Sequence, residues 1–180
     1  MTVSTANGAE GPVYRPRPFL PVSAALGACE HGNASLDESA RRLSHEEFRV
    51  ARALAAEGHD VRSVAERRGG GRTADLEVCG TPVEVKSWLA LHERRGVVPG
   101  PRSVVNKLIS AEGQSPVVVL AAQGSGLSAA AASAGVAHYA GLRPESGIST
   151  VRVMGDGFDL SWRRPPGIEL AGLPRRGVGI

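Results

Sequence analysis

The chain has 180 residues, enough for one domain with a hydrophobic core and too few for two domains of ordinary size. Aromatic residues make up only 4%, so the core must rest on Ala, Val, Leu and Ile, and the net charge of +3 permits a nucleic-acid partner without arguing for one. No apolar run is long enough to cross a membrane, and residues 1–23 lack the apolar segment of a signal peptide. These absences predict a soluble cytoplasmic protein with no membrane partner.

Cysteine and lysine are both scarce in this chain. Cys29 and Cys79 are far apart in sequence and lack the spacing of a metal site or a disulfide framework, so we interpret Cys79 as a small buried hydrophobic residue. Of the 21 basic residues only two are lysines, Lys86 and Lys107. In a chain this rich in arginine, the presence of a lysine can indicate a site that needs an ammonium group. Chance placement of the lysine is an equal alternative.

The first half of the chain changes from irregular to periodic at residue 44. Residues 1–43 carry Gly, Pro, Ser and Asn without periodicity and predict a flexible N-terminal arm. Ser44 and Glu47 have the spacing of a capping box, which begins a helix that Gly58 ends. Three strands follow, at 60–64, 74–79 and 82–88, and the last two form a hairpin.

The second half of the chain alternates helices and strands. Its predicted elements are a helix at 103–112 capped by Ser103, a buried strand at 116–122, an alanine-rich helix at 128–141, and a hairpin of strands at 149–154 and 157–162. This order predicts an α/β fold, with an α+β mixed sheet, an α-β-β-β-α-β core, an added helix and a C-terminal hairpin. The domain spans residues 44–165, and residues 166–180 form a flexible tail.

The first hairpin gathers charge on one face. A turn at residues 80–81 pairs Glu77 with Glu84 and Asp75 with Lys86. Two opposed carboxylates repel unless a cation lies between them. One interpretation is a solvated strand face with a surface ion pair. The other is a site for Mg²⁺ or Mn²⁺, beside which Lys86 orients the attacking water.

The motif Asp75-x₈-Glu84-Val-Lys86, on the second and third strands of this element order, resembles that of the PD-(D/E)xK nucleases, which share the restriction-endonuclease-like fold. Ala74 replaces the usual proline before the aspartate. The resemblance implies phosphodiester cleavage with Mg²⁺ or Mn²⁺ held by Asp75 and Glu84. Many members also place an acid on the first helix near the metal, and Glu47 has that position. Its alternative role is the capping box.

A narrower resemblance covers about residues 44–162. The helix from Glu47, the charged hairpin, and a helix that ends in Gly113 and Gln114 before an apolar strand are similar to the C-terminal toxin domains of contact-dependent growth inhibition proteins. In particular, they are similar to the PD-(D/E)xK tRNA nucleases among these domains. This resemblance implies metal-dependent RNA cleavage, with tRNA preferred over DNA, and an immunity protein as a possible partner.

Further polar residues are expected to bind nucleic acid. Two arginine-rich loops flank the hairpin and are candidates for phosphate contacts, with solvated loop charge as the alternative. The candidate residues are Arg67, Arg68, Arg72, Arg94, Arg95, Arg102, Lys107 and Gln114, the last two assigned to the second helix. The alternative to a nuclease is a non-catalytic module that binds nucleic acid or protein on the same fold. The oligomeric state stays open.

Overall fold

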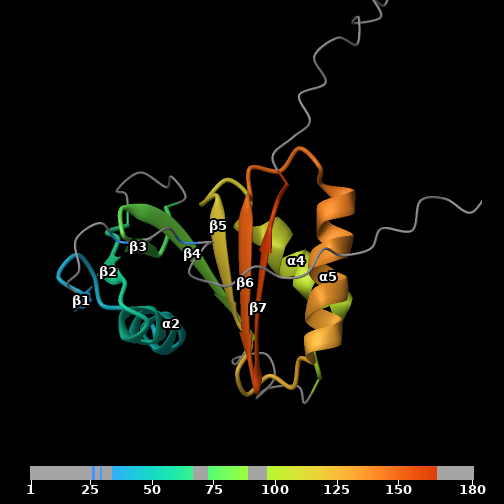
Figure 1. Ribbon diagram of the computed structural model, residues 1–180, viewed down its shortest axis with the longest axis horizontal. Coiled ribbons are helices and arrows are strands. Elements are labelled where there is room, and N and C mark those ends of the chain that lie inside the picture. Colours follow the sequence, from blue (N-terminus) through green and yellow to red (C-terminus); the bar gives the residue numbers. More distant parts are fainter. Residues whose placement is uncertain (1–25, 27–28, 30–33, 67–72, 89–96, 166–180) are drawn as a thin grey trace, which may run out of the picture.

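A mixed β-sheet runs through the whole computed structural model, which describes residues 26, 29, 34–66, 73–88 and 97–165 (Figure 1). The sheet has seven strands in the order of the sequence. The strands are β1 (Ser35–Asp37), β2 (Asp60–Ser63), β3 (Leu76–Val78), β4 (Thr81–Ser87), β5 (Val117–Ala121), β6 (Thr150–Gly155) and β7 (Phe158–Arg163). The helices in this part of the chain are α2 (His45–Ala56), α4 (Pro101–Ala111) and α5 (Ala129–Leu142).

The strand directions divide the sheet into antiparallel and parallel parts. β2, β3 and β4 are antiparallel neighbours, whereas β4, β5 and β6 run parallel because helices α4 and α5 connect them. β7 returns antiparallel to β6. The predicted mixed α/β fold and its order of elements are confirmed. β1 is an addition to the predicted order: it pairs parallel to β2, within the segment that the sequence predicts to be a flexible arm.

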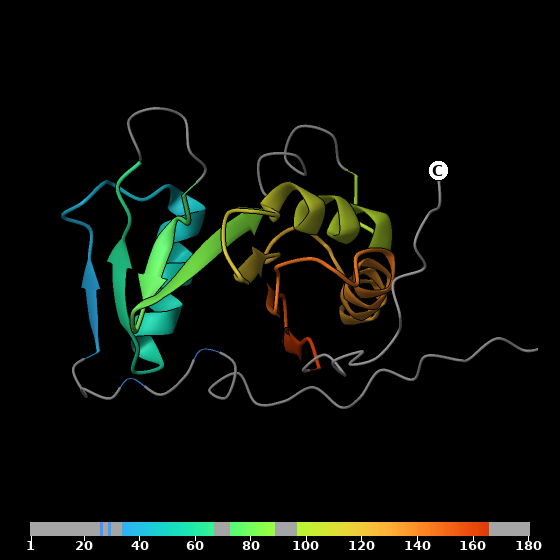
Figure 2. The same cartoon turned by 90° about the horizontal axis from the view of Figure 1, so that it is seen from above.

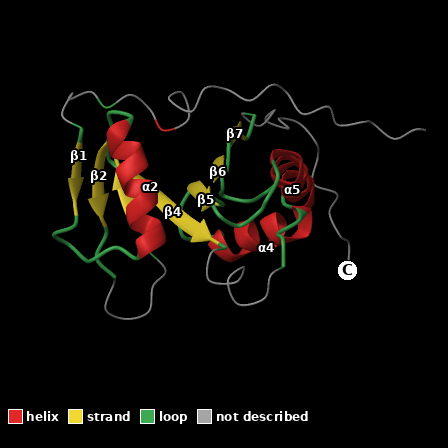
Figure 3. Cartoon of the chain, turned by 90° about the horizontal axis from the view of Figure 1, so that it is seen from below, coloured by secondary structure: helices red, strands yellow, loops and turns green. Residues whose placement is uncertain are grey.

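The helices cover the two faces of the sheet, as views from above and below show (Figures 2 and 3). Val50, Ala51 and Leu54 of α2 pack on one face, against apolar side chains of β2 to β5. α4 and α5 pack on the other face, against β5 and β6. Successive residues of β5 alternate between the two clusters, so this central strand is buried on both faces, as its continuous apolar run predicts.

The turn of the β3–β4 hairpin lies one residue earlier than predicted. Cys79 and Gly80 have φ angles of 49° and 77°, and positive φ at both central residues is typical of a type I′ turn. Leu76 therefore pairs with Val83, and Glu77 lies opposite Pro82. The predicted pairing of Glu77 with Glu84 is wrong. The faces are unchanged, because moving the pairing by two residues preserves the alternation of side chains.

Two further predictions need correction. α4 begins after Gly100 with Pro101 in its first turn, so Ser103 lies inside the helix and is not its cap. The interpretation of Cys79 as a small buried hydrophobic residue in a chain without a disulfide is also wrong. Cys29 and Cys79 form a disulfide, with their Cα atoms 5.3 Å apart, and Cys79 is half-buried. The contact spans 50 residues, which spacing patterns of short metal or disulfide motifs do not reach.

Close packing of α4 on α5 predicts the effect of a single methyl group. A Cβ at Gly135 of α5 would lie 2.5 Å from Val104 Cβ and 2.7 Å from the carbonyl oxygen of Pro101. We expect Gly135→Ala to lower the free energy of unfolding by about 1–3 kcal/mol, although alanine favours a helix interior over glycine by about 1 kcal/mol. Urea denaturation measures the change.

The matched control is Gly141→Ala in the same helix, where an added Cβ would meet no atom within 4 Å. This variant should be as stable as the wild type or more stable by up to about 1 kcal/mol. An increase in stability of equal size for both variants would contradict the packing described between α4 and α5.

Candidate active site

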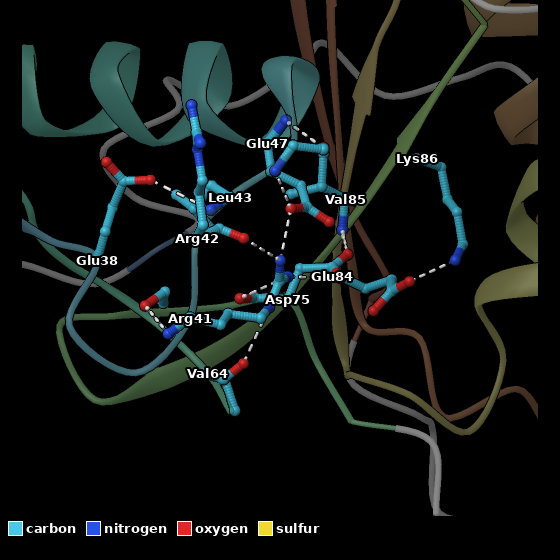
Figure 4. A network of polar contacts seen from close by, with 12 residues as sticks. Glu38, Arg41, Arg42, Leu43, Glu47, Val64, Asp75, Glu84, Val85 and Lys86 are labelled. Atoms are coloured by element: carbon cyan, nitrogen blue, oxygen red, sulfur yellow. Dashed lines mark hydrogen bonds and ion pairs between the residues drawn. The ribbon is translucent and has the colours of Figure 1, made fainter. Parts of the chain in front are cut away.

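Three carboxylates from separate elements meet beside β4 (Figure 4). Asp75 directly precedes β3, and one residue beyond the Leu76–Val83 pair the register sets it opposite Glu84. The backbone N–H of Val85 donates to Asp75 Oδ2 at 2.9 Å. Glu47 enters from the first turn of α2, and its carboxylate and that of Asp75 contact the same guanidinium, that of Arg41. The structure thus brings together the three acids that the sequence proposed as metal ligands.

Glu47 caps α2 and also lies beside Asp75. Its N–H donates to Ser44 Oγ at 3.3 Å, and its Oε2 accepts from the N–H of Ser44 at 2.8 Å, which confirms the capping box. The same carboxylate lies next to Asp75. The hydrogen bonds of the capping box hold the Glu47 side chain in the orientation that brings its carboxylate next to Asp75.

Arg41 is a member of this site that the sequence did not reveal. Its Nη1 lies 2.7 Å from Glu47 Oε2 and its Nη2 lies 3.1 Å from Asp75 Oδ1. Its Nε donates to the carbonyl of Val64 at 3.0 Å, which fixes the direction of the guanidinium. No spacing in the sequence identifies Arg41, because its contact with Asp75 joins residues that are 34 apart and depends on tertiary structure. The guanidinium therefore compensates part of the negative charge that, in the interpretation as a metal site, a metal ion would compensate.

Glu84 is the most deeply buried acid of the cluster, with a residue exposure of 1%. Its Oε1 pairs with Lys86 Nζ, while Oε2 has no hydrogen-bond partner within the described part of the chain. Arg152 is similarly buried, yet all three of its guanidinium nitrogens are bonded to Glu57 or Asp159. A buried polar atom without a partner costs about 1–3 kcal/mol. A hard cation at Oε2 would remove that cost, so the donor set fits Mg²⁺ or Mn²⁺.

The electrostatics of the three acids differ. Burial raises the pKa of Asp75 to about 7, opposed by the Val85 N–H and reinforced by the charges of Glu84 and Glu47. Burial also raises the pKa of Glu84, against the effect of Lys86. For Glu47 burial acts in the same direction, but the hydrogen bonds and charge of Arg41 outweigh it and lower the pKa. Without a metal, Asp75 therefore holds a proton at slightly acidic pH.

The chain has two lysines, Lys86 of β4 and Lys107 of α4. Lys107 of α4 is half-buried, with its Nζ 5.9 Å from the centroid of the Trp88 ring. Burial lowers the pKa of Lys107, and the positive charge of Lys86 lowers it further. Two ammonium groups repel unless an anion lies near them. A substrate phosphate would supply such an anion.

The remaining predicted nucleic-acid contacts are only partly described. Arg102 is exposed on the first turn of α4. Gln114 follows the end of α4 instead of lying on it, and its amide donates to the Ser110 carbonyl at 2.8 Å. Its side chain is engaged with the helix end, not with the acids. Five other predicted contacts lie outside the described residues: Arg67, Arg68, Arg72, Arg94 and Arg95.

Comparisons with known proteins give no relative for this chain. No protein-family model, no curated protein and no solved structure matches it. Among the described residues, no helix combines the length and apolar character needed to cross a membrane. The functional interpretation below therefore depends on the motif and on the geometry of the site.

The raised pKa of Asp75 predicts how stability depends on pH. An aspartate that ionises near pH 3.8 when unfolded and near 7 when folded favours folding while it is protonated, and that advantage is lost as the pH rises from about 4 to about 7. Asp75→Asn removes the ionisation. We compare the melting temperatures of the variant and the wild type in EDTA at pH 5 and at pH 8. The melting temperature of the variant minus that of the wild type should be at least about 3 °C larger at pH 8 than at pH 5.

The control for this comparison is Glu77→Gln, which changes a carboxylate of the same hairpin that lies opposite Pro82. Thermal unfolding of the three proteins at both pH values gives the result. A difference between Asp75→Asn and wild type that stays constant from pH 5 to pH 8 would contradict the raised pKa of Asp75.

Proposed function

We propose that the chain is a metal-dependent endonuclease that hydrolyses phosphodiester bonds, with RNA preferred over DNA. One observation carries the proposal: the carboxylate of Glu84 is buried, with one oxygen held by Lys86 and the other without a partner in the described chain. A carboxylate kept in this condition suits a site that gains a cation in its working state. Asp75 and Lys86, the other two residues of the motif, lie next to it.

Asp75 and Glu84 would hold the ion, and Glu47, which shares the guanidinium of Arg41 with Asp75, would complete or support the site. A bound Mg²⁺ or Mn²⁺ would supply Lewis acidity to the scissile phosphate and to the attacking water. Asp75 has to release its proton before it can act as a ligand, so we expect metal affinity to increase as the pH rises towards 7. Arg41 keeps Glu47 ionised beside it.

The two lysines would act on the substrate. Lys86 is anchored by Glu84 and can donate hydrogen bonds to the attacking water or to the phosphate oxygens, where negative charge develops in the transition state. Lys107 adds a second positive charge on the side of α4 and would bind a substrate phosphate. This division assigns the chemistry to the β4 strand and the positioning of the substrate to α4.

The choice of RNA, and of tRNA in particular, depends on the similarity of the sequence to tRNA-nuclease toxin domains. An immunity protein as partner follows from the same similarity. The chemistry of the site alone is compatible with cleavage of either nucleic acid, because its described residues would act on the phosphate group that RNA and DNA share.

One observation favours a second function, a non-catalytic module that binds nucleic acid or protein. Arg41 already bridges Glu47 and Asp75, at 2.7 and 3.1 Å, and so compensates part of their charge without a metal. In this alternative the lysines and the exposed Arg102 bind phosphates or acidic side chains, and no bond is cleaved.

Cleavage and metal-binding assays separate the two functions. The purified full chain is incubated with total tRNA and with plasmid DNA, in Mg²⁺, in Mn²⁺ and in EDTA. We expect metal-dependent cleavage of tRNA by the wild type, and losses of about 10²–10³-fold for Glu84→Gln and for Lys86→Met. Titration calorimetry with Mn²⁺ should show one site in the wild type and none in Glu84→Gln.

Glu77→Gln is again the matched control, and it should cleave like the wild type. Equal cleavage by the wild type and Glu84→Gln would identify a contaminating nuclease and refute the proposed site. Metal-independent binding of tRNA without turnover would support the binding module instead.

A further inference from the structure

A second cluster of metal-ligating side chains lies at the other end of β3 from Asp75. Cys79 belongs to the turn that follows β3, His59 directly precedes β2, and Cys29 comes from the segment before β1. Asp75 precedes the first residue of β3, so the length of this strand separates the two sites. The proposed nuclease reaction does not use the second cluster, and the inference below does not depend on that reaction.

The three side chains each offer one ligand atom, and these atoms lie within 4.8 Å of one another. His59 Nδ1 is 3.9 Å from Cys29 Sγ and 3.6 Å from Cys79 Sγ. Around a tetrahedral Zn²⁺, with bonds of about 2.3 Å to sulfur and about 2.0–2.1 Å to nitrogen, neighbouring sulfur and nitrogen ligands are about 3.5 Å apart. The imidazole therefore already stands at nearly the right distance from both sulfurs.

The surroundings suit thiolates and a neutral imidazole. His59 is 7% exposed, so its ring is held by the fold with Nδ1 directed at the sulfurs. The backbone N–H of Asp60 donates to Cys29 Sγ at 3.4 Å, and a hydrogen bond of this kind favours the thiolate. The carboxylate of Asp60 is engaged with Ser35 and Arg62, so it does not compete as a hard ligand. A set of two sulfurs and one imidazole selects a soft or borderline ion such as Zn²⁺.

We propose that Cys29, His59 and Cys79 form a Zn²⁺ site when the cysteines are reduced, and that the disulfide is its oxidised, metal-free form. Two thiols of a reductant convert the disulfide into two cysteine thiols and become a disulfide themselves. Zn²⁺ then displaces the two thiol protons, and His59 Nδ1 completes three protein ligands, with water in the fourth position. In the reverse direction, a small-molecule disulfide takes two electrons from the two thiolates, becomes two thiolates, and Zn²⁺ is released.

The test uses the full chain, reduced with a phosphine that is then removed without air, and Co²⁺ as a coloured substitute for Zn²⁺. One equivalent of Co²⁺ should produce thiolate-to-metal charge-transfer bands and the intense visible bands of tetrahedral coordination. Zn²⁺ should abolish them by replacing the Co²⁺. The oxidised chain should show neither set of bands, and addition of Mg²⁺ should leave the spectrum of the reduced chain unchanged.

The variants are Cys29→Ser, Cys79→Ser and His59→Ala, each compared with the reduced wild type, which also lacks the disulfide. Removing a residue that only hydrogen-bonds to a metal ligand weakens metal binding by about 10–100-fold. Each of these variants removes a ligand itself, so each should weaken Zn²⁺ binding by more than that. His138→Ala, an exposed histidine on α5, is the matched control and should bind normally. Glu84→Gln should also retain the bands, since its site is separate.

Several results would overturn the proposal. These are a folded, reduced wild type in which excess Co²⁺ produces no thiolate bands, thiolate bands of equal intensity in the oxidised chain, or bands that form with unchanged affinity in His59→Ala. Circular dichroism monitors folding in every sample. A reduced chain that unfolds and is refolded by Zn²⁺ supports the proposal, because ligand binding then supplies the folding free energy, and one that stays unfolded with Zn²⁺ contradicts it.

Discussion

A carboxylate buried inside a β-sheet has to be compensated, and the arrangement around β4 follows from that requirement at Glu84. β4 lies between β3 and β5, so Glu84 cannot reach solvent past an edge of the sheet. Lys86, two residues along the strand, lies on the same face and meets one carboxylate oxygen. The N–H of Val85, the residue between Glu84 and Lys86, donates a hydrogen bond to the Asp75 carboxylate. The backbone of a single strand thus sets the relative positions of both motif acids and the lysine, and these positions persist as long as the register does.

The two proposed functions differ in the protonation of Asp75. With the proton in place, Asp75 can donate to a neighbouring carboxylate, Arg41 compensates Glu47, and Glu84 Oε2 is the carboxylate oxygen that lacks a partner within the described part of the site. Without it, three carboxylates face one guanidinium and one nearby ammonium, and a divalent cation becomes the natural complement. Nuclease and binding module therefore do not require different folds. In the nuclease, a divalent cation would bind strongly enough to displace the proton from Asp75. In the binding module, it would not.

Features with local causes could be predicted from the sequence. The capping box of Ser44 and Glu47 and the apolar run of β5 involve neighbouring residues only, and both are as predicted. The charged and apolar faces of the hairpin were also correct, although the turn was placed one residue late. The error has a local cause. A type I′ turn needs a positive φ at Cys79, and cysteine is not a residue type that commonly adopts positive φ. Arg41 and Cys29 were missed because their contacts span 34 and 50 residues and depend on tertiary structure.

Described residues before α2 contact both ends of β3. Arg41 binds Asp75 near the start of this strand, and Cys29 is bonded to Cys79 just after its end. Between them, β1 pairs with β2 and covers an edge that would otherwise expose unpaired backbone groups. A chain that began at residue 44 would keep every acid of the candidate site. It would lose the guanidinium that holds Glu47 ionised beside Asp75, so the acids would repel each other more strongly, and their affinity for a metal would no longer be that of the intact protein.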